Sequence, residues 1–120
     1  MKILVVDDSK AMRMIVLRTL KQTGLGSHTT LEASNGKEAL ELIESESPDL
    51  VLSDWNMPEM KGIELLEKVR AAGNNVRFGF VTSESSSETK TQAQEAGADF
   101  VLTKPFTADA MEMTLEPFMA

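Results

Sequence analysis

The sequence contains no cysteine, few aromatic residues and no long apolar run. Without cysteine the chain can form neither a disulfide framework nor a thiolate metal site. No apolar stretch approaches the roughly 20 residues that a membrane-spanning helix requires. Basic residues are also scarce, since 12 lysines and arginines face 19 aspartates and glutamates and leave a net charge of −7. This charge argues against nucleic acids and anionic membranes as partners, because both bind basic surfaces.

The length of the chain, 120 residues, is that of one ordinary domain. We expect a single domain over residues 1–120, with no attached effector domain. The amino terminus leads directly into a short apolar run and has none of the features of a signal peptide. The expected protein is cytoplasmic and monomeric.

Short apolar runs alternate five times with amphipathic stretches. This pattern is typical of an α/β fold in which helices cover both faces of a parallel sheet. The expected strands cover residues 2–6, 29–33, 49–53, 76–81 and 100–103, with the polar segment 29–33 at the edge of the sheet. Helices are expected between Ser9 and Gly24, between Asn35 and Pro48, between Gly62 and Gly73, from Glu88 to Ala96, and from Ala108.

Two helices carry more specific expectations. The first should begin at Ser9, a good N-cap, and bury Met12, Ile15, Val16 and Leu20, which recur at helical spacing. The helix over 88–96 has almost no apolar stripe and should be the least stable element.

The single histidine, His28, lies in a Gly-Ser loop and is expected at the surface.

Polar side chains follow four of the five apolar runs. They are Asp7 and Asp8 after the first run, Asp54 after the third, Thr82 after the fourth and Lys104 after the fifth. Ligands of an open α/β sheet bind in the crevice beyond the carboxyl ends of its strands. We therefore expect these side chains to converge on one site.

Three carboxylates at one point favour a bound cation. Two carboxylates about 5 Å apart repel each other by roughly 3 kcal/mol at an effective dielectric constant near 20. Hard oxygen ligands, with no histidine or cysteine nearby, indicate Mg²⁺ or Mn²⁺ rather than Zn²⁺. Thr82 and Lys104 add a hydroxyl and an ammonium that can bind phosphoryl oxygens. Such a site can accept a phosphoryl group on the carboxylate that the metal leaves free.

These residues belong to four motifs that together resemble those of a known family. The motifs are Val5-Val6-Asp7-Asp8-Ser9, Ser53-Asp54-Trp55-Asn56-Met57-Pro58, Val81-Thr82-Ser83-Glu84 and Lys104-Pro105-Phe106. With them the chain resembles the CheY-like receiver domains of response regulators in two-component signalling, over its whole length. The resemblance implies a flavodoxin-like fold, with five parallel strands in the order 2-1-3-4-5 and five flanking helices. It also implies signalling of the chemotaxis type.

The resemblance further implies a phospho-acceptor and a metal site. Asp54 would accept the phosphoryl group from a sensor histidine kinase or a phosphotransfer protein. Mg²⁺ would be held by Asp8, by Asp54 and by the backbone carbonyl of Asn56, with Asp7 acting through a water molecule. Apart from phosphorylation of Asp54 and its reversal, no enzyme activity is implied.

The remaining implied roles concern the phosphorylated state. Lys104 would pair with the phosphoryl group, and the peptide bond before Pro105 would be cis. Thr82 would move toward the phosphoryl oxygens and carry the change outward. Asn56 and Glu84 would set the lifetime of the phosphate to seconds or minutes.

One departure from the family pattern concerns the switch. Receiver domains usually carry tyrosine or phenylalanine three residues before the lysine, where this chain has Val101. A valine has almost no rotamer change to offer, so switching at Val101 is either weaker or different in kind. Phe100 has a ring but should point to the opposite face of its strand. Trp55, beside the acceptor, is expected to be partly exposed.

A second departure concerns the output surface, formed by the helix over 88–96, the strand over 100–103 and the last helix. This surface is polar here, with Ser85-Ser86-Ser87 and Thr89-Lys90-Thr91, and is poorly suited to an acidic, hydrophobic motor peptide. We therefore expect a downstream protein partner other than the flagellar motor. The sequence does not identify that partner.

Three alternatives remain open at this point. The domain could drain or relay phosphate rather than signal, or it could be an interaction module that is not phosphorylated. A Mg²⁺-dependent phosphatase of the haloacid dehalogenase type would use the same residue types. That type, however, places Asp-x-Asp after the first strand, where this chain has the adjacent pair Asp7-Asp8.

Overall fold

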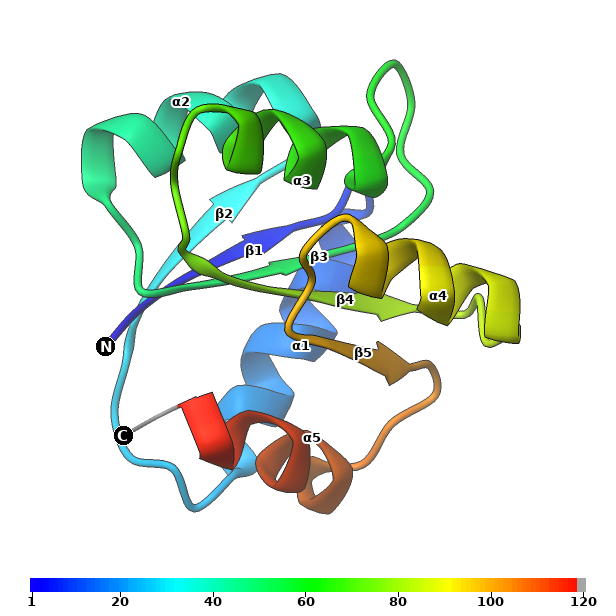
Figure 1. Cartoon of the computed structure of the whole chain (residues 1–120). Coiled ribbons are helices and arrows are strands. Elements are labelled where there is room, and N and C mark those ends of the chain that lie inside the picture. Colours follow the sequence, from blue (N-terminus) through cyan, green and yellow to red (C-terminus); the bar gives the residue numbers. More distant parts are fainter. Residues whose placement is uncertain (119–120) are drawn as a thin grey trace.

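The computed structural model describes residues 1–118 and has a five-stranded parallel sheet with helices on both faces (Figure 1). The strand order β2-β1-β3-β4-β5 confirms the predicted order. The strands are β1 (Lys2–Val6), β2 (Thr29–Ala33), β3 (Leu50–Ser53), β4 (Arg77–Thr82) and β5 (Phe100–Thr103). The helices are α1 (Lys10–Gln22), α2 (Gly36–Glu46), α3 (Gly62–Ala71), α4 (Ser87–Glu95) and α5 (Ala108–Leu115), and a 3₁₀ turn (Glu116–Phe118) follows α5.

The sheet divides the core into two layers. Helices α2, α3 and α4 cover one face, and α1 and α5 cover the other (Figure 1). Successive strand residues point to opposite faces, so Leu4 and Val6 pack under the first set of helices while Ile3 and Val5 pack under the second. Both faces of the central strands are therefore apolar, which leaves the strand ends as the place for polar chemistry.

Helix α1 begins where the sequence predicts but buries a different stripe. The Ser9 hydroxyl accepts a hydrogen bond from the Met12 amide at 3.2 Å and caps the helix. The expectation that Ile15 is buried is wrong, because its side chain is 44% exposed, whereas Val16, Thr19 and Leu20 are buried. Ile15 lies instead on the side of α1 that faces the β5–α5 loop.

Helix α4 is the most polar helix, as predicted, and only Thr89 and Ala93 of it are buried. Beside it, β5 is an edge strand that pairs with β4 alone. A Cβ atom on Gly79 of β4 would lie 2.1 Å from the ring of Phe100, so the glycine leaves the space that this ring fills. Gly79 thus allows β4 and β5 to pack closely at this point.

His28 is more enclosed than the sequence predicts. Both of its ring nitrogens are shielded from solvent and have no hydrogen-bond partner among residues 1–118. It lines a hollow of about 280 Å³ with Leu17, Leu20 and Lys21 at the end of α1. Burial, and secondarily the charge of the amino terminus, lowers the pKa of His28.

This lowered pKa predicts a pH-dependent stability. The unfolded chain binds a proton at His28 more readily than the folded chain, so the folded state loses stability as the pH falls through 6.5 toward the lowered value. We expect His28→Gln to remove part of the stability difference between pH 7.5 and pH 5.5, measured by urea denaturation. An identical pH dependence in wild type and variant would contradict this expectation.

Within residues 1–118, no helix combines the length and the apolar character needed to cross a membrane.

Candidate functional site

The strand register brings the predicted polar residues to the carboxyl edge of the sheet. Val6 of β1 lies beside Ser53 of β3, and the Asp54 amide donates to the Val6 carbonyl at 2.9 Å. At the other side of the site, the Lys104 amide donates to the Thr82 carbonyl at 2.8 Å. The parallel ladder therefore continues one residue beyond β3 and β5 and holds the backbone of the site.

Three carboxylates form an acidic cluster at this edge. Oxygen atoms of Asp7, Asp8 and Asp54 all lie within 4.8 Å of one another. Asp7 is buried, Asp54 is half-buried and Asp8 is exposed, so the cluster is open to solvent on one side. Carboxylate oxygens at this separation, with an open side for water, fit a hard divalent cation such as Mg²⁺ or Mn²⁺. These residues could hold a metal ion.

Lys104 provides the positive charge of the site. Its ammonium lies 3.5 Å from Oδ2 of Asp7 and 3.6 Å from Oδ1 of Asp54, and its side chain is 18% exposed. The peptide bond between Lys104 and Pro105 is cis, as predicted. One ammonium thus faces two carboxylates, which leaves the cluster with a net negative charge.

The electrostatics of Asp54 reflect this excess of carboxylates. Burial raises the pKa of Asp54, and the neighbouring Asp7 raises it further. Lys104 and the hydrogen bond from the Trp55 amide, 2.8 Å from Oδ1, oppose the rise without cancelling it. The folded state therefore holds the ionised form of Asp54 at a cost in free energy.

This cost predicts that Asp54→Asn stabilises the metal-free protein. A raised pKa in the folded state means that the carboxylate destabilises the fold at pH 7, and that this penalty disappears as the pH falls through the raised value. We expect the variant to melt above wild type at pH 7 without divalent cations, measured by thermal denaturation. The gain should shrink at pH 4, and a variant that melts below wild type at pH 7 would contradict the argument.

Thr82 lies beside the acidic cluster, and Asn56 and Glu84 form the exposed rim of the site. Thr82 is fully buried, and its Oγ1 accepts from the Glu84 amide at 3.1 Å. The Asn56 amide group donates to the Glu84 carboxylate at 3.3 Å, and both side chains are exposed. The structure therefore brings these three residues together next to the acidic cluster, while their roles stay predictions.

The aromatic residues near the site come from β4 and the β3–α3 loop. Val101 lies beside Phe80 in the strand register, on the face covered by α4. Phe80 is fully buried, and its ring centroid lies 4.8 Å from that of Trp55 in an edge-on arrangement. Trp55 is only 8% exposed, so the expectation of partial exposure is wrong. Phe100 packs on the opposite face, as predicted.

Two residues that support the site were not singled out from the sequence. Ser53 is fully buried at the end of β3, and its hydroxyl donates to the Asp54 carbonyl at 2.9 Å. Arg13 of α1 donates to the Asp7 carbonyl at 2.7 Å. A serine that ends an apolar strand was a visible signal in the first case. The second contact joins a helix to the preceding loop, and spacing alone gave no sign of it.

Comparison with known proteins identifies close relatives of this arrangement. A sequence model described as the response regulator receiver domain matches residues 3–116. A chemotaxis protein CheY homolog of Campylobacter jejuni is 42% identical over 119 residues, which cover 97% of this chain and 90% of the relative. The chemotaxis protein CheY1 of Helicobacter pylori is 40% identical over 119 residues and covers 97% of this chain and 94% of its own length.

Solved structures show the same fold. The receiver domain of the Francisella response regulator 1452 superposes with a TM-score of 0.87 at 32% identity, covering 98% of this chain and 95% of that chain. The chemotaxis protein CheY4 of Vibrio cholerae superposes with a TM-score of 0.86 at 34% identity, covering 98% and 97%. The family match and the structural matches thus span nearly the same residues.

Proposed function

The chain belongs to the family of response regulator receiver domains, and on this premise we propose that it is a response regulator phosphorylated on Asp54. Members of this family are regulators rather than enzymes. The phosphoryl donor would be a sensor histidine kinase or a phosphotransfer protein, which places this chain in the cytoplasm with its donor. The output would be contact with another protein, in signalling of the chemotaxis type.

One observation carries the proposal. Asp54 lies in a cluster with two further carboxylates, and the Lys104 ammonium lies 3.6 Å from its Oδ1. Its carboxylate is the nucleophile, so transfer would break the P–N bond of a phosphohistidine and form a P–O bond on Asp54. Lys104 would pair with the negative phosphoryl oxygens.

The acidic cluster would hold the metal. We propose Asp8, Asp54 and the backbone carbonyl of Asn56 as its ligands, with Asp7 acting through a water molecule. Mg²⁺ bound there would neutralise negative charge on the transferring group. Mn²⁺ prefers the same oxygen ligands and would serve as a substitute.

The donor would approach from the side of α1. Met12, Ile15, Pro105 and Phe106 line an apolar hollow of about 390 Å³, and Lys104 forms part of its wall. Ile15 is 44% exposed although it is apolar, which suits a surface that a partner covers. A donor helix placed here would lie next to the phosphorylation site.

The output surface would be α4, β5 and α5. Thr82 is buried and lies beside Thr103 of β5 in the strand register, so its movement toward a phosphoryl group would reach β5. Val101 lacks a ring that could change rotamer, and this observation favours the second candidate, a phosphate sink or relay with a weak output switch. If the protein bound a partner only when Asp54 was phosphorylated, this would favour signalling over a phosphate sink or relay.

We expect the lifetime of the phosphate on Asp54 to depend on Asn56 and Glu84. Both side chains are exposed at the rim and joined by a hydrogen bond of 3.3 Å, so they can orient a water molecule toward the phosphoryl group. We expect Asn56→Ala to slow the loss of phosphate by about threefold to tenfold, followed with a radioactive label. The matched control is Asn75→Ala at an exposed site outside this rim. A wild-type lifetime of hours at 25 °C would contradict the expectation.

The proposal is tested by titration with Mg²⁺ and then with beryllofluoride, a phosphoryl mimic. The indole of Trp55 is buried directly after the acceptor, so its fluorescence is a suitable readout. We expect a response to both ligands in wild type and none to beryllofluoride in Asp54→Asn. No binding of either ligand in calorimetry would overturn the proposal and favour an interaction module that is not phosphorylated.

A further inference from the structure

We propose that Arg13 is a positioning residue for the metal site, because it fixes the peptide that joins Asp7 to Asp8. The inference rests on the proposed function, since it concerns how that site is held in shape. Arg13 lies in α1, and its Nη1 donates to the Asp7 carbonyl oxygen at 2.7 Å.

The same guanidinium is anchored from the other side. Its Nε donates to the Glu32 carboxylate of β2 at 2.9 Å, and the Arg13 side chain is only 14% exposed. Arginine presents several donors in a planar fork, so one side chain can hold a carbonyl and a carboxylate in a fixed relation. Arg13 therefore connects the start of α1, the end of β1 and the strand β2.

The Asp7 carbonyl, which Arg13 binds, belongs to the peptide that sets the relative orientation of two proposed metal-site residues, Asp7 and Asp8. A peptide unit is planar, so the carbonyl of Asp7 lies in one plane with the Cα atoms of Asp7 and Asp8. Rotation of this plane would turn the two side chains relative to each other. Further contacts already fix Asp7, because its amide donates to the Ala33 carbonyl at 3.1 Å and its Oδ1 accepts from the Ser9 amide at 2.9 Å. Of these contacts, the one from Arg13 is made by a side chain and can be removed by substitution.

Charge and positioning predict opposite effects on metal affinity. Arg13 is a cation near a site for a cation, so loss of its charge alone would tighten Mg²⁺ binding. Loss of a fixed ligand geometry would weaken binding, and substitutions of groups that orient metal ligands typically cost about 10–100-fold in affinity or activity. The sign of the change therefore separates the two effects.

The experiment measures the dissociation constant of Mg²⁺ by calorimetry and by Trp55 fluorescence. We expect Arg13→Gln to raise this constant about tenfold. Arg13→Lys keeps the charge but loses the fork, and we expect a loss of about threefold. Glu32→Gln keeps Arg13 and weakens only its anchor, at a carboxylate that is 44% exposed, so we expect a twofold to threefold loss with the fold intact.

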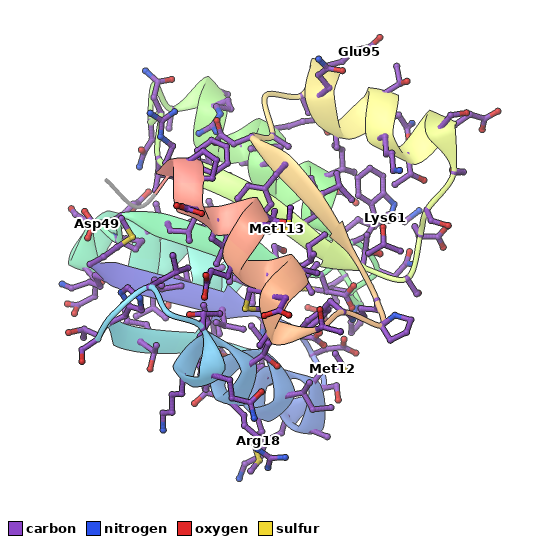
Figure 2. All side chains as sticks on the ribbon, turned by 90° about the horizontal axis from the view of Figure 1, so that it is seen from below. Met12, Arg18, Asp49, Lys61, Glu95 and Met113 are labelled. Atoms are coloured by element: carbon purple, nitrogen blue, oxygen red, sulfur yellow. The ribbon has the colours of Figure 1, made fainter. Side chains whose placement is uncertain are left out.

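The matched control is Arg70→Gln. Arg70 also binds carbonyls, with Nη1 at 2.8 Å from the Val76 oxygen and Nη2 at 2.8 Å from the Gly97 oxygen, but these lie at the amino ends of β4 and β5. Its loss should lower the melting temperature and leave Mg²⁺ affinity unchanged. Arg18→Gln, on the outer side of α1 (Figure 2), should change neither quantity.

The outcomes of this experiment separate a failure of the proposed role of Arg13 from a failure of the proposed metal site. Unchanged or tighter Mg²⁺ binding by Arg13→Gln would overturn the role of Arg13, as would an equal weakening by Arg70→Gln. If wild type itself binds no Mg²⁺, the proposed metal site fails and the inference fails with it. Weaker binding in the Arg13 and Glu32 variants alone would support the inference.

Discussion

Exchange of Lys104 for methionine is expected to tighten Mg²⁺ binding about tenfold and to weaken beryllofluoride binding at least 100-fold. The ammonium lies 3.5 Å from an Asp7 oxygen and 3.6 Å from an Asp54 oxygen, so it competes with a metal cation for the same carboxylates. Removing it leaves three carboxylates with no cation among them. Their attraction for Mg²⁺ should therefore increase.

The magnitudes follow from the short distances. A pair of unit charges 3.5 Å apart interacts by about 4–5 kcal/mol at an effective dielectric constant of 20, and only part of this remains after solvation. A tenfold gain in Mg²⁺ affinity corresponds to about 1.4 kcal/mol, well within that bound. A phosphoryl mimic loses a charge-assisted hydrogen bond, and the expected 100-fold loss corresponds to about 2.7 kcal/mol.

The experiment is informative because the affinities for Mg²⁺ and for beryllofluoride are expected to change in opposite directions. Both affinities are measured by Trp55 fluorescence at fixed ionic strength, since exposed charges are screened by salt. The control is Lys90→Met in α4, which removes the same charge at an exposed position. If both ligands bound Lys104→Met more weakly, the substitution would have damaged the site as a whole. If beryllofluoride binding were unchanged, Lys104 would not contact the phosphoryl group.

The strand ends of this fold could be predicted because they obey a general rule of parallel sheets. Apolar runs set the strands, the carboxyl ends of parallel strands share one edge, and the residues that follow each run must meet there. Asp7, Asp54, Thr82 and Lys104 follow this rule, and the structure gathers all four. No side-chain contact had to be known in advance, since position along the chain fixed the edge on which each residue lies.

Residues whose environment depends on side-chain packing were harder to predict. Ile15 and Val16 are neighbours in α1, and helical periodicity alone placed both in the core. The sheet buries only Val16, and Ile15 faces the β5–α5 loop instead. Trp55 is buried because the ring of Phe80, far away in the sequence, packs against it. Such contacts are set by the three-dimensional arrangement and leave no periodic signal.

Replacement of Gly62 by alanine is expected to cost about 3 kcal/mol of stability, or roughly 10 °C in melting temperature. Gly62 is the first residue of α3, and a Cβ atom there would lie 2.1 Å from the Asp54 carbonyl oxygen and 2.8 Å from the ring of Phe80. The Gly62 amide also donates to the Trp55 carbonyl at 2.9 Å. Helix α3 thus begins directly against the peptide that carries the acceptor.

This clash is costly because the nearest atom belongs to the backbone. A flexible side chain could rotate away from an added methyl group, but the Asp54 carbonyl can move only if β3 or α3 moves with it. Gly24→Ala is the matched control, since a Cβ atom at Gly24 would meet only the end of the Glu112 side chain, at 3.0 Å. That variant should lose less than about 1 kcal/mol, measured with Gly62→Ala by thermal and urea denaturation.

The displacement should reach the site as well as the fold. A shift of the Asp54 peptide by even part of an ångström moves the carboxylate relative to Lys104 and Asp7, and reacting groups tolerate little misplacement. We therefore expect Gly62→Ala to bind beryllofluoride more weakly than wild type at 10 °C, where both proteins are folded, while Gly24→Ala binds it normally. A melting temperature within 2 °C of wild type would contradict the argument. Normal beryllofluoride binding in a destabilised Gly62→Ala would mean that α3, rather than the acceptor peptide, yields to the methyl group.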